Sequence, residues 1–196
     1  KLIFVSSNFR FGNKRKGNIN LLKKLSKKYN YRLINTIPYK HKNKIVSSTL
    51  IRKSLQKGNL KFANTLLSRT WYVDGVVKKG KRLGKKLGYP TCNINIKSYI
   101  LPKIGIYTVK ISIGKNKKIF KGIAYLGYRP TFGGKEIILE VNIFGIKKNL
   151  YNKKLRVYFL KLIRGEQKFK NSASLIKQMN KDVILAKKSL KTKLVL

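Results

Sequence analysis

From about residue 71 to residue 164, the chain consists of short segments in which apolar and polar residues alternate. In residues 137–144, four apolar residues share one face, and Glu140 and Asn142 lie on the other. A period of two is typical of strands with one buried face. Such segments occur at residues 72–77, 105–113, 119–126, 137–144 and 155–163. Short turns between strands favour an antiparallel barrel, so we predict a mainly β fold here.

The first 70 residues show a different pattern, in which strands and helices alternate. Strands are expected at residues 2–5 and 31–37. Helices are expected to begin after Asn18, at residues 47–49 and after Asn59, because Asn, Ser and Thr accept hydrogen bonds at helix N-termini. These strands are too few for a complete sheet, which indicates a partial α/β segment. We therefore predict two domains, residues 1–70 and 71–196.

A C-terminal helix is expected from Ser172 onward. Its apolar residues recur at helical spacing, which predicts one buried face. They are Leu175, Met179, Val183, Ala186 and Leu190. We expect this apolar stripe, including Met179, to lie in the core.

The segment GKRLGKKLGYPTCN, residues 80–93, is rich in glycines and cations. Gly80, Gly84 and Gly88 would let backbone N–H groups approach an anion closely. The countercharge would come from Lys81, Arg82, Lys85 and Lys86. Thr91 and Asn93 then offer two neutral oxygens, which suit a Mg²⁺ ion that also binds phosphates and water. The pattern predicts a site for a nucleotide and its metal, although a basic glycine-rich loop that enters a strand has the same pattern.

The chain carries 48 Lys and Arg residues against 5 Asp and Glu, a formal net charge of +43. Such a charge suggests a nucleic-acid partner. However, 39 of the cations are Lys and only 9 are Arg, and they are spread over every segment. Surfaces that read phosphates and bases use Arg more often. We interpret the charge as compositional bias and expect no dedicated nucleic-acid partner; a basic RNA- or ribosome-associated β-barrel protein without catalytic activity is the alternative.

In so basic a chain, each acidic residue is a candidate for a specific role. The five are Asp74, Glu136, Glu140, Glu166 and Asp182. We expect Glu136 and Asp74 to be salt-bridge partners of the abundant lysines. Glu140 could act as a general base toward an alcohol if it lay in the partly dry mouth of a barrel. A solvent-facing Glu140 paired with a lysine is the alternative.

The single cysteine, Cys92, excludes an intramolecular disulfide and fits a reducing compartment such as the cytoplasm. No signal peptide is visible, no apolar run is long enough to span a membrane, and no membrane association is expected. The chain starts at Lys1 and its only methionine is Met179. We therefore expect it to be a piece of a longer translation product.

Five motifs occur in order: GKRLGKKLGYPTCN at 80–93, GIYTVKI at 105–111, GIAYLGYRPTF at 122–132, LEVNIF at 139–144 and LIRGEQKF at 162–169. This series closely resembles the riboflavin kinase domain that ends bacterial bifunctional riboflavin kinase/FAD synthetases. The resemblance covers roughly residues 71–190. It implies a six-stranded antiparallel Greek-key-type barrel with a C-terminal helix. It also implies transfer of the ATP γ-phosphate to the 5′-hydroxyl of riboflavin, which gives FMN.

The resemblance also implies roles for particular residues. Thr91 and Asn93 would hold Mg²⁺ with the phosphates, and Glu140 would be the base toward the flavin hydroxyl. The glycine-rich loop would cover the nucleotide, through Gly80, Gly84, Lys85 and Gly88. Arg164 would lie near the flavin. The sequence departs from the family where Cys92 replaces the usual Ala, and Asn149–Asn152 replaces the more common Asp-Leu-Tyr-Gly; neither change removes a reacting group. A flavin-binding module whose kinase activity has decayed is a further alternative, against which the intact Thr91, Asn93 and Glu140 argue.

Residues 6–18 and 46–59 resemble the back half of the FAD synthetase domain that precedes the kinase in bacteria. In that nucleotidyltransferase family, the segment at the start of a helix helps to hold ATP phosphates; here it would be Ser47, Ser48, Thr49 and Arg52. The same residues could also form an ordinary N-cap. The family's other phosphate motif, His-x-Gly-His, is absent, and the only histidine is His41 in a polar loop. FMN adenylylation to FAD is therefore expected only of the full-length protein.

Overall fold

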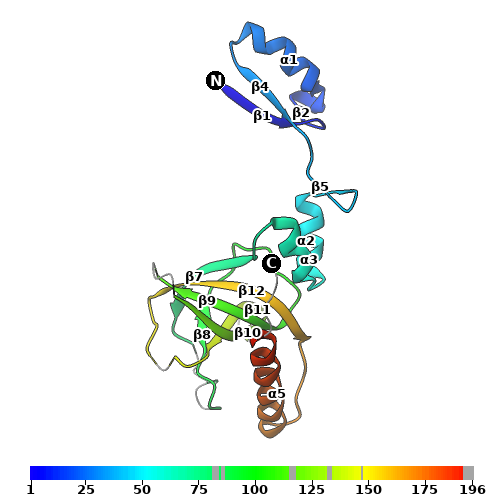
Figure 1. Ribbon diagram of the computed structural model, residues 1–196. Coiled ribbons are helices and arrows are strands. Elements are labelled where there is room, and N and C mark those ends of the chain that lie inside the picture. Colours follow the sequence, from blue (N-terminus) through cyan, green and yellow to red (C-terminus); the bar gives the residue numbers. More distant parts are fainter. Residues whose placement is uncertain (81–83, 85–86, 115–117, 132–133, 147, 192–196) are drawn as a thin grey trace. The chain divides into compact units, whose positions relative to one another are not determined.

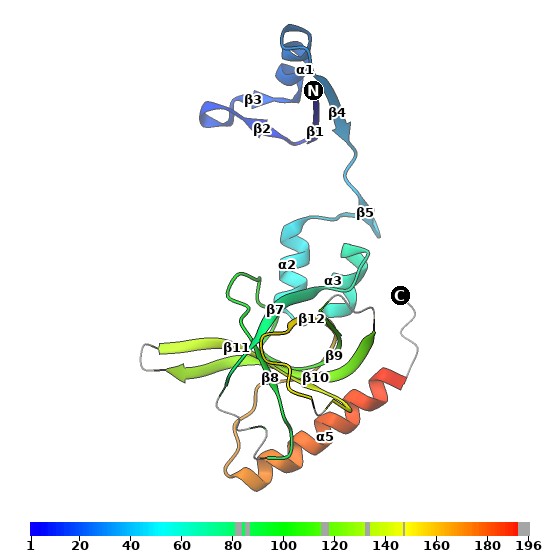
Figure 2. The ribbon, with the colours of Figure 1, turned by 90° about the vertical axis from the view of Figure 1, so that its left-hand side faces the viewer.

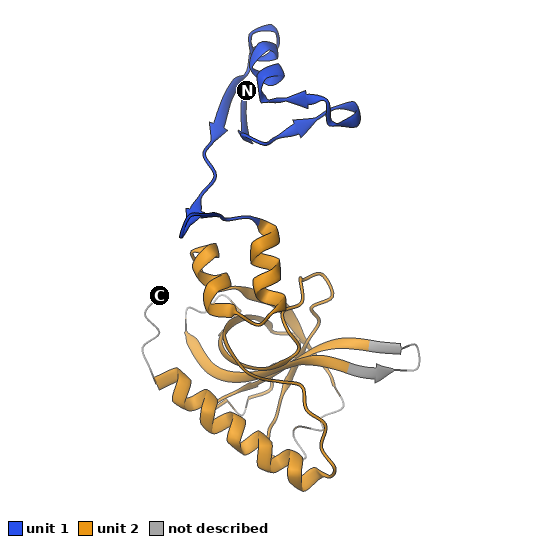
Figure 3. Cartoon of the chain, turned by 90° about the vertical axis from the view of Figure 1, so that its right-hand side faces the viewer, with its two compact units in different colours: residues 1–47 blue, residues 48–196 orange. Residues whose placement is uncertain are grey.

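The computed structural model covers residues 1–196 and describes all of them except 81–83, 85–86, 115–117, 132–133, 147 and 192–196 (Figure 1). The chain forms two compact units, residues 1–47 and 48–196 (Figure 3). None of the described helices is long and apolar enough to cross a membrane.

The first unit contains a strand–helix–strand arrangement. Strand β1 (Leu2–Ser6) pairs in parallel with β4 (Arg32–Thr36), and α1 (Ile19–Lys28) connects them. The Asn18 side chain accepts a hydrogen bond from the backbone N–H of Leu21 at 3.0 Å, which confirms the predicted N-cap. The smaller elements are β2 (Arg10–Phe11), η1 (Asn13–Arg15), β3 (Gly17–Asn18), β5 (Lys40–His41) and β6 (Lys44–Ile45). The predicted strands and helix of this unit are confirmed.

The second unit is built on a closed barrel, whose strands are visible as a ring in Figure 2. The strands are β7 (Tyr72–Lys78), β8 (Cys92–Ile94), β9 (Gly105–Ile113), β10 (Ile119–Thr131), β11 (Gly134–Ile143) and β12 (Lys154–Gly165). Their order around the barrel is β10-β11-β8-β7-β12-β9, and every neighbouring pair is antiparallel. The predicted six-stranded antiparallel barrel is therefore confirmed.

Alternate residues of the strands fill the barrel, as the period of two predicts. Tyr107, Val109 and Ile111 of β9 are fully buried, and so are Leu139 and Val141 of β11. At one end, the Phe159 ring contacts the Trp71 and Tyr107 rings edge-on, with centroids 5.0 Å apart in each case. The inward positions are therefore occupied by packed side chains, and a binding site must use the outward ones.

Two short helices, α2 (Ser48–Gln56) and α3 (Leu60–Leu67), pack on the barrel as part of the second unit. The Asn59 side chain caps α3, as predicted, by accepting a hydrogen bond from Phe62 N. The Asn64 side chain then joins α3 to two strands: it accepts from Trp71 N at 2.8 Å and donates to the Phe159 carbonyl at 3.2 Å. The compact unit therefore begins at Ser48, and the division into domains 1–70 and 71–196 stays a prediction.

The C-terminal helix α5 (Ser172–Lys191) lies along the outside of the barrel (Figures 1 and 2). Its Ala186 and Leu190 side chains are buried, as expected for the apolar stripe. The other three residues of the stripe line a cavity between the helix and the barrel: Leu175, Met179 and Val183. The prediction that Met179 is a core residue is therefore wrong, because the helix covers an open space at this point.

Candidate active site

A cavity of about 340 Å³ lies between α5 and the outer face of the barrel. Its apolar walls come from strand residues such as Ile106 and Ile123 and from helix residues such as Val183. The polar or charged residues of its lining include Thr91, Tyr125, Glu140, Arg164, Glu166 and Asp182. An apolar cavity with a few convergent polar groups is typical of small-molecule sites. We call it the first cavity.

Glu140 belongs to a row of directly paired residues that crosses the strands. Tyr125, Glu140, Ile106 and Arg164 of this row line the first cavity, whereas Asn93 and Lys78 line a separate pocket. Glu140 of β11 pairs with Tyr125 of β10 on one side and with Asn93 of β8 on the other. The row continues to Lys78 in one direction and to Ile106 and Arg164 in the other. Directly paired residues share one face of a sheet, and the chain neighbours of Glu140 point into the barrel. Glu140 therefore lies on the outer wall of the barrel, in the cavity that α5 covers, and not in the mouth of the barrel; its role as a base stays a prediction.

Thr91 and Asn93 lie beside Glu140, although 47 residues separate Asn93 from it in sequence. The Thr91 hydroxyl donates to the Glu140 carboxylate at 3.5 Å. The segment is fixed by the Asn142 side chain, which donates to the Pro90 carbonyl at 2.7 Å. Asn93 Oδ1 is buried and has no hydrogen-bond partner among the described residues. A buried carbonyl oxygen without a partner is unfavourable, so this atom suits a ligand that supplies a hydrogen-bond donor or a cation.

No three His, Cys, Asp or Glu side chains are grouped as a metal site within the part of the chain that the structure describes. A metal at Thr91 and Asn93 would thus depend on phosphate and water for its other ligands. Hard oxygen ligands of this kind suit Mg²⁺, which is usually bound with substrate phosphates and several waters. The residues present therefore fit the ion that the sequence predicts.

At two of the three predicted glycines, a side chain would overlap neighbouring atoms of the site. A Cβ atom at Gly80 would overlap the Asn93 amide. A Cβ atom at Gly84 would overlap the Tyr89 carbonyl and lie 3.2 Å from the Thr91 hydroxyl. Gly88 has a φ of +84°, which favours glycine, but lies in open space. The predicted Lys85, like the cations Lys81, Arg82 and Lys86, lies outside the described residues.

Arg164 reaches the first cavity because of a β-bulge in β12. The register shifts between Leu162 and Arg164, so Leu162 pairs with the buried Tyr107 while Arg164 pairs with the cavity residue Ile106. Without the bulge, Leu162 and Arg164 would point to the same side.

Asp182 of α5 fixes the Arg164 guanidinium. Its carboxylate accepts from Arg164 Nε at 3.0 Å and from Nη2 at 2.7 Å. Gln178 also donates to it at 2.9 Å, and Asp182 is only 2% exposed. The ion pair therefore attaches α5 to the barrel wall at the cavity.

Tyr125 and Glu166 form a second polar contact in the cavity. The Tyr125 hydroxyl donates to Glu166 Oε1 at 2.5 Å. Burial, aided by this hydrogen bond and by the charges of Glu166 and Glu140, raises the pKa of the Tyr125 hydroxyl. The sequence interpretation gave no role to Tyr125, Glu166 or Asp182. The scarcity of carboxylates was the signal for the two acids, and nothing in the sequence singled out Tyr125.

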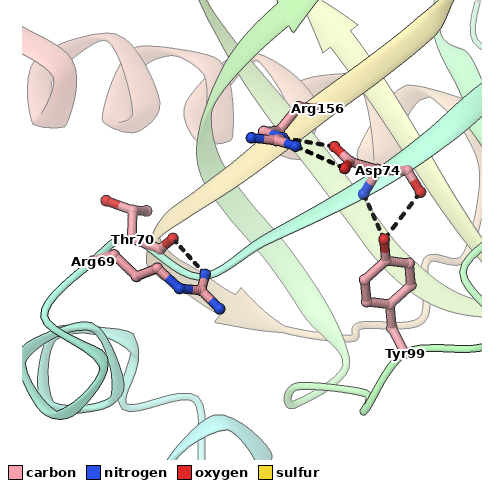
Figure 4. Close-up of polar contacts among 5 residues, drawn as sticks. All are labelled: Arg69, Thr70, Asp74, Tyr99 and Arg156. Atoms are coloured by element: carbon pink, nitrogen blue, oxygen red, sulfur yellow. Dashed lines mark hydrogen bonds and ion pairs between the residues drawn. The ribbon is translucent and has the colours of Figure 1, made fainter.

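The remaining two acids form ion pairs away from this cavity. Asp74 makes a bidentate pair with Arg156, at 2.8 and 2.9 Å, and its backbone contacts the Tyr99 hydroxyl (Figure 4). The Arg156 guanidinium lowers the pKa of the Asp74 carboxyl. Glu136 lies 3.9 Å from the Lys97 ammonium. Both acids are salt-bridge partners as predicted, although the partner of Asp74 is an arginine.

Thr91 also lines a second cavity, of about 290 Å³. Its lining includes Pro90, Cys92, Ile146, Lys148 and Tyr151. Thr91 lines both cavities, so ligands in the two would meet at this residue. The asparagine-rich segment that departs from the family pattern, through Asn149, also lines the second cavity.

The residues predicted to hold phosphates in the nucleotidyltransferase segment fall at the division between the units. Ser47 ends the first unit, whereas Ser48, Thr49 and Arg52 belong to α2 of the second. The predicted helix is confirmed, and Gly58 follows it with a φ of +76°. The proposed role of these four residues toward phosphates stays a prediction.

Residues 67–190 match the family model described as riboflavin kinase, which is more than half of the chain. The chain belongs to the riboflavin kinase family. Residues 1–50 match the family model described as FAD synthetase. Both predicted resemblances are therefore confirmed.

Bifunctional relatives of the riboflavin kinase family match nearly the whole chain. It is 42% identical over 191 residues to the bifunctional riboflavin kinase/FMN adenylyltransferase of Buchnera aphidicola subsp. Schizaphis graminum, covering 96% of this chain and 61% of that protein. The protein of the same name from Haemophilus influenzae is 35% identical over 187 residues, covering 95% of this chain and 60% of that protein. The chain thus spans about 60% of the length of these relatives.

A solved structure is also similar to this member of the riboflavin kinase family. It is a crystal structure titled as a macrolide-efflux protein from Streptococcus pneumoniae. The TM-score is 0.79 at 30% identity, covering 93% of this chain and 58% of that one.

Proposed function

We propose that this chain transfers the γ-phosphate of ATP to the 5′-hydroxyl of riboflavin, giving FMN and ADP. The observation that carries the proposal is the position of Thr91. It lines both cavities, donates to Glu140 and precedes by two residues Asn93, whose buried side-chain oxygen has no hydrogen-bond partner among the described residues. Two substrates could therefore meet where a base and a metal site adjoin, which is the arrangement that phosphoryl transfer requires.

The charges of the two cavities support a different substrate for each. The described lining of the first cavity holds three carboxylates and one guanidinium, whereas that of the second holds Lys148 and no carboxylate. A polyphosphate would be repelled by the first lining and favoured by the second. We therefore assign ATP to the second cavity, and riboflavin, which is uncharged and has a large aromatic ring, to the first.

The residues then divide the chemistry between them. Glu140 accepts the proton of the flavin hydroxyl while the hydroxyl oxygen attacks the γ-phosphorus of ATP. The bond between the γ-phosphorus and the oxygen that bridges it to the β-phosphate breaks, which releases ADP. Thr91 and Asn93 would hold Mg²⁺. When bound, the ion neutralises phosphate charge in the transition state. The Thr91 hydroxyl, which donates to Glu140, orients the carboxylate, and Arg164 provides a fixed cation beside the flavin.

The direct test is to incubate the protein with riboflavin, ATP and Mg²⁺ and to measure FMN by chromatography. We expect FMN to form in an amount equal to the ATP consumed, and to need both ATP and the metal. The Thr91→Val and Asn93→Leu variants should lose this activity, whereas Asp74→Asn, which alters an acid that pairs with Arg156 and lines neither these cavities nor the pocket at Asn93, should keep it. Folded protein that forms no FMN would refute the proposal.

We further propose that the full-length protein adenylylates FMN to FAD, because relatives that carry both names are longer than this chain. A comparison of FAD formation by this chain and by the longer protein tests this point. We also propose a cytoplasmic location, where ATP is available and the Cys92 thiol would stay reduced.

A further inference from the structure

The polar contact between Tyr125 and Glu166 lies in the wall of the first cavity, and the proposed mechanism does not use it. We propose that this pair recognises the hydroxyl groups of the substrate that neighbour the reacting one, so that the enzyme selects a polyhydroxylated side chain. This inference rests on the proposed function and deepens it. It assigns a specificity-determining role to Tyr125 and Glu166.

The position of Tyr125 supports this role. Tyr125 is paired directly with Glu140 across β10 and β11, and directly paired side chains of antiparallel strands have Cβ atoms about 5 Å apart. A substrate hydroxyl that reaches the Glu140 carboxylate would bring the next groups of its chain to Tyr125. Both residues line the same cavity, together with Glu166.

The hydrogen-bond chemistry of the pair selects the kind of group it can bind. The single O–H of Tyr125 is donated to Glu166, so the phenolic oxygen can only accept a hydrogen bond from a ligand. The Glu166 carboxylate is also an acceptor. Since burial and the nearby carboxylates raise the pKa of Tyr125, its hydroxyl keeps this proton. The pair therefore offers acceptors alone, and hydroxyl groups on a flexible chain are donors that can satisfy them.

The pair is held in place before any ligand binds. A Cβ atom at Gly127, two residues along β10, would overlap the hydroxyl end of the Tyr125 ring. The missing side chain thus leaves the space in which Tyr125 reaches Glu166. An acceptor fixed in advance discriminates between ligands, because an analogue without the matching donor leaves the half-buried Tyr125 oxygen without a ligand partner.

The test compares riboflavin with an analogue whose side chain is 5-hydroxypentyl. This analogue keeps the terminal hydroxyl and lacks the others. For each flavin, kcat/KM of phosphorylation is measured with the wild-type protein and with Tyr125→Phe, which removes the phenolic oxygen. We expect Tyr125→Phe to lower kcat/KM about tenfold for riboflavin and less than about twofold for the analogue. Only riboflavin has the additional hydroxyls whose contact with Tyr125 the variant removes.

A second variant, Gly127→Ala, should reproduce this selective loss by displacing Tyr125 without changing its chemistry. Tyr128→Phe is the matched control, because Tyr128 lies on the same strand, is 45% exposed and is outside the described lining of the cavity. For Tyr128→Phe, the ratio of kcat/KM for riboflavin to kcat/KM for the analogue should equal that of the wild type.

Equal losses for both flavins with Tyr125→Phe would show a purely structural role and overturn the inference, as would no loss at all. The dissociation constants of both flavins, measured without ATP by quenching of flavin fluorescence, give the same comparison independently of catalysis. If the wild type forms no FMN, the proposed kinase activity fails. The ratio of the two dissociation constants, compared between the wild type and Tyr125→Phe, then still decides whether Tyr125 and Glu166 recognise the hydroxyl groups of the side chain.

Discussion

Replacing Asp182 with Asn should strongly destabilise the second unit, because it leaves Arg164 charged and without its carboxylate partner. Asp182 is 2% exposed, and the Arg164 side chain is 20% exposed. Removing one member of a buried ion pair costs about 3–5 kcal/mol. Since Arg164 retains some exposure, we expect the lower end, about 3 kcal/mol. For a domain of this size that corresponds to a Tm lower by about 6–12 °C.

A double variant separates the charge from the packing. Arg164→Met with Asp182→Leu removes both charges and keeps similar side-chain volumes. Replacing a buried ion pair with apolar residues is often neutral or stabilising, so the double variant should unfold within about 1 kcal/mol of the wild type. The double variant should bind riboflavin more weakly than the wild type does, because it lacks the Arg164 guanidinium in the first cavity. The double substitution would thus restore stability but not the affinity for riboflavin.

The assay is urea and thermal unfolding followed by circular dichroism on the ligand-free protein, with riboflavin affinity measured by quenching of flavin fluorescence. A Tm for Asp182→Asn within about 2 °C of the wild type would refute the view that the pair anchors α5. A double variant as unstable as the single one would show that packing, not an unpaired charge, accounts for the loss. Full recovery of riboflavin binding in the double variant would remove Arg164 from the proposed site.

Three further predictions concern single residues. Glu140→Gln should lower kcat for FMN formation by about 10²–10⁴-fold and change the riboflavin dissociation constant by less than about threefold; turnover at the wild-type rate would exclude the proposed base. Gly84→Ala should raise the KM for riboflavin by about tenfold, since its Cβ would displace Tyr89 and Thr91 in the lining of the first cavity; an unchanged KM would show that the loop tolerates the side chain. Because the pKa of Asp74 is lowered in the folded state, its pair with Arg156 stabilises the protein above about pH 4, and this contribution is lost as the pH falls through the lowered pKa. Asp74→Asn should therefore cost about 0.5–1 kcal/mol in urea unfolding at pH 7 and almost nothing at pH 2, and equal costs at both pH values would contradict this linkage.

The strands of the barrel could be predicted from the sequence because each buries one face. Residues 105–113 were predicted as a strand, and β9 has the same bounds. The pairing of β8 with β11 could not be predicted in this way. Cys92–Ile94 is too short to show a period of its own, and its register with Glu140 depends on closure of the whole barrel.

The candidate site was predictable only in part, because it too depends on contacts between segments that are distant in the sequence. Motifs in the sequence indicated Thr91, Asn93 and Glu140, and the sheet register brings them together. The bulge that turns Arg164 toward the cavity leaves no mark in the pattern of residues. Likewise, the stripe of α5 has one period along its length, yet one end packs on the core and the other covers a cavity. Periodicity identifies the buried face of a helix but not what lies opposite.

The acidic residues carry more functional information than the net charge does. Among 48 cations, a carboxylate on the surface easily finds a partner, as Asp74 and Glu136 do. The other three acids all line the first cavity, on three different elements: strand β11, the segment after β12, and helix α5. Their meeting in one small cavity cannot result from local sequence composition, because the fold alone brings them together. The cavity is thus the one described place where a strongly basic chain concentrates negative charge, and this supports its assignment to the neutral substrate whose hydroxyl must lose a proton.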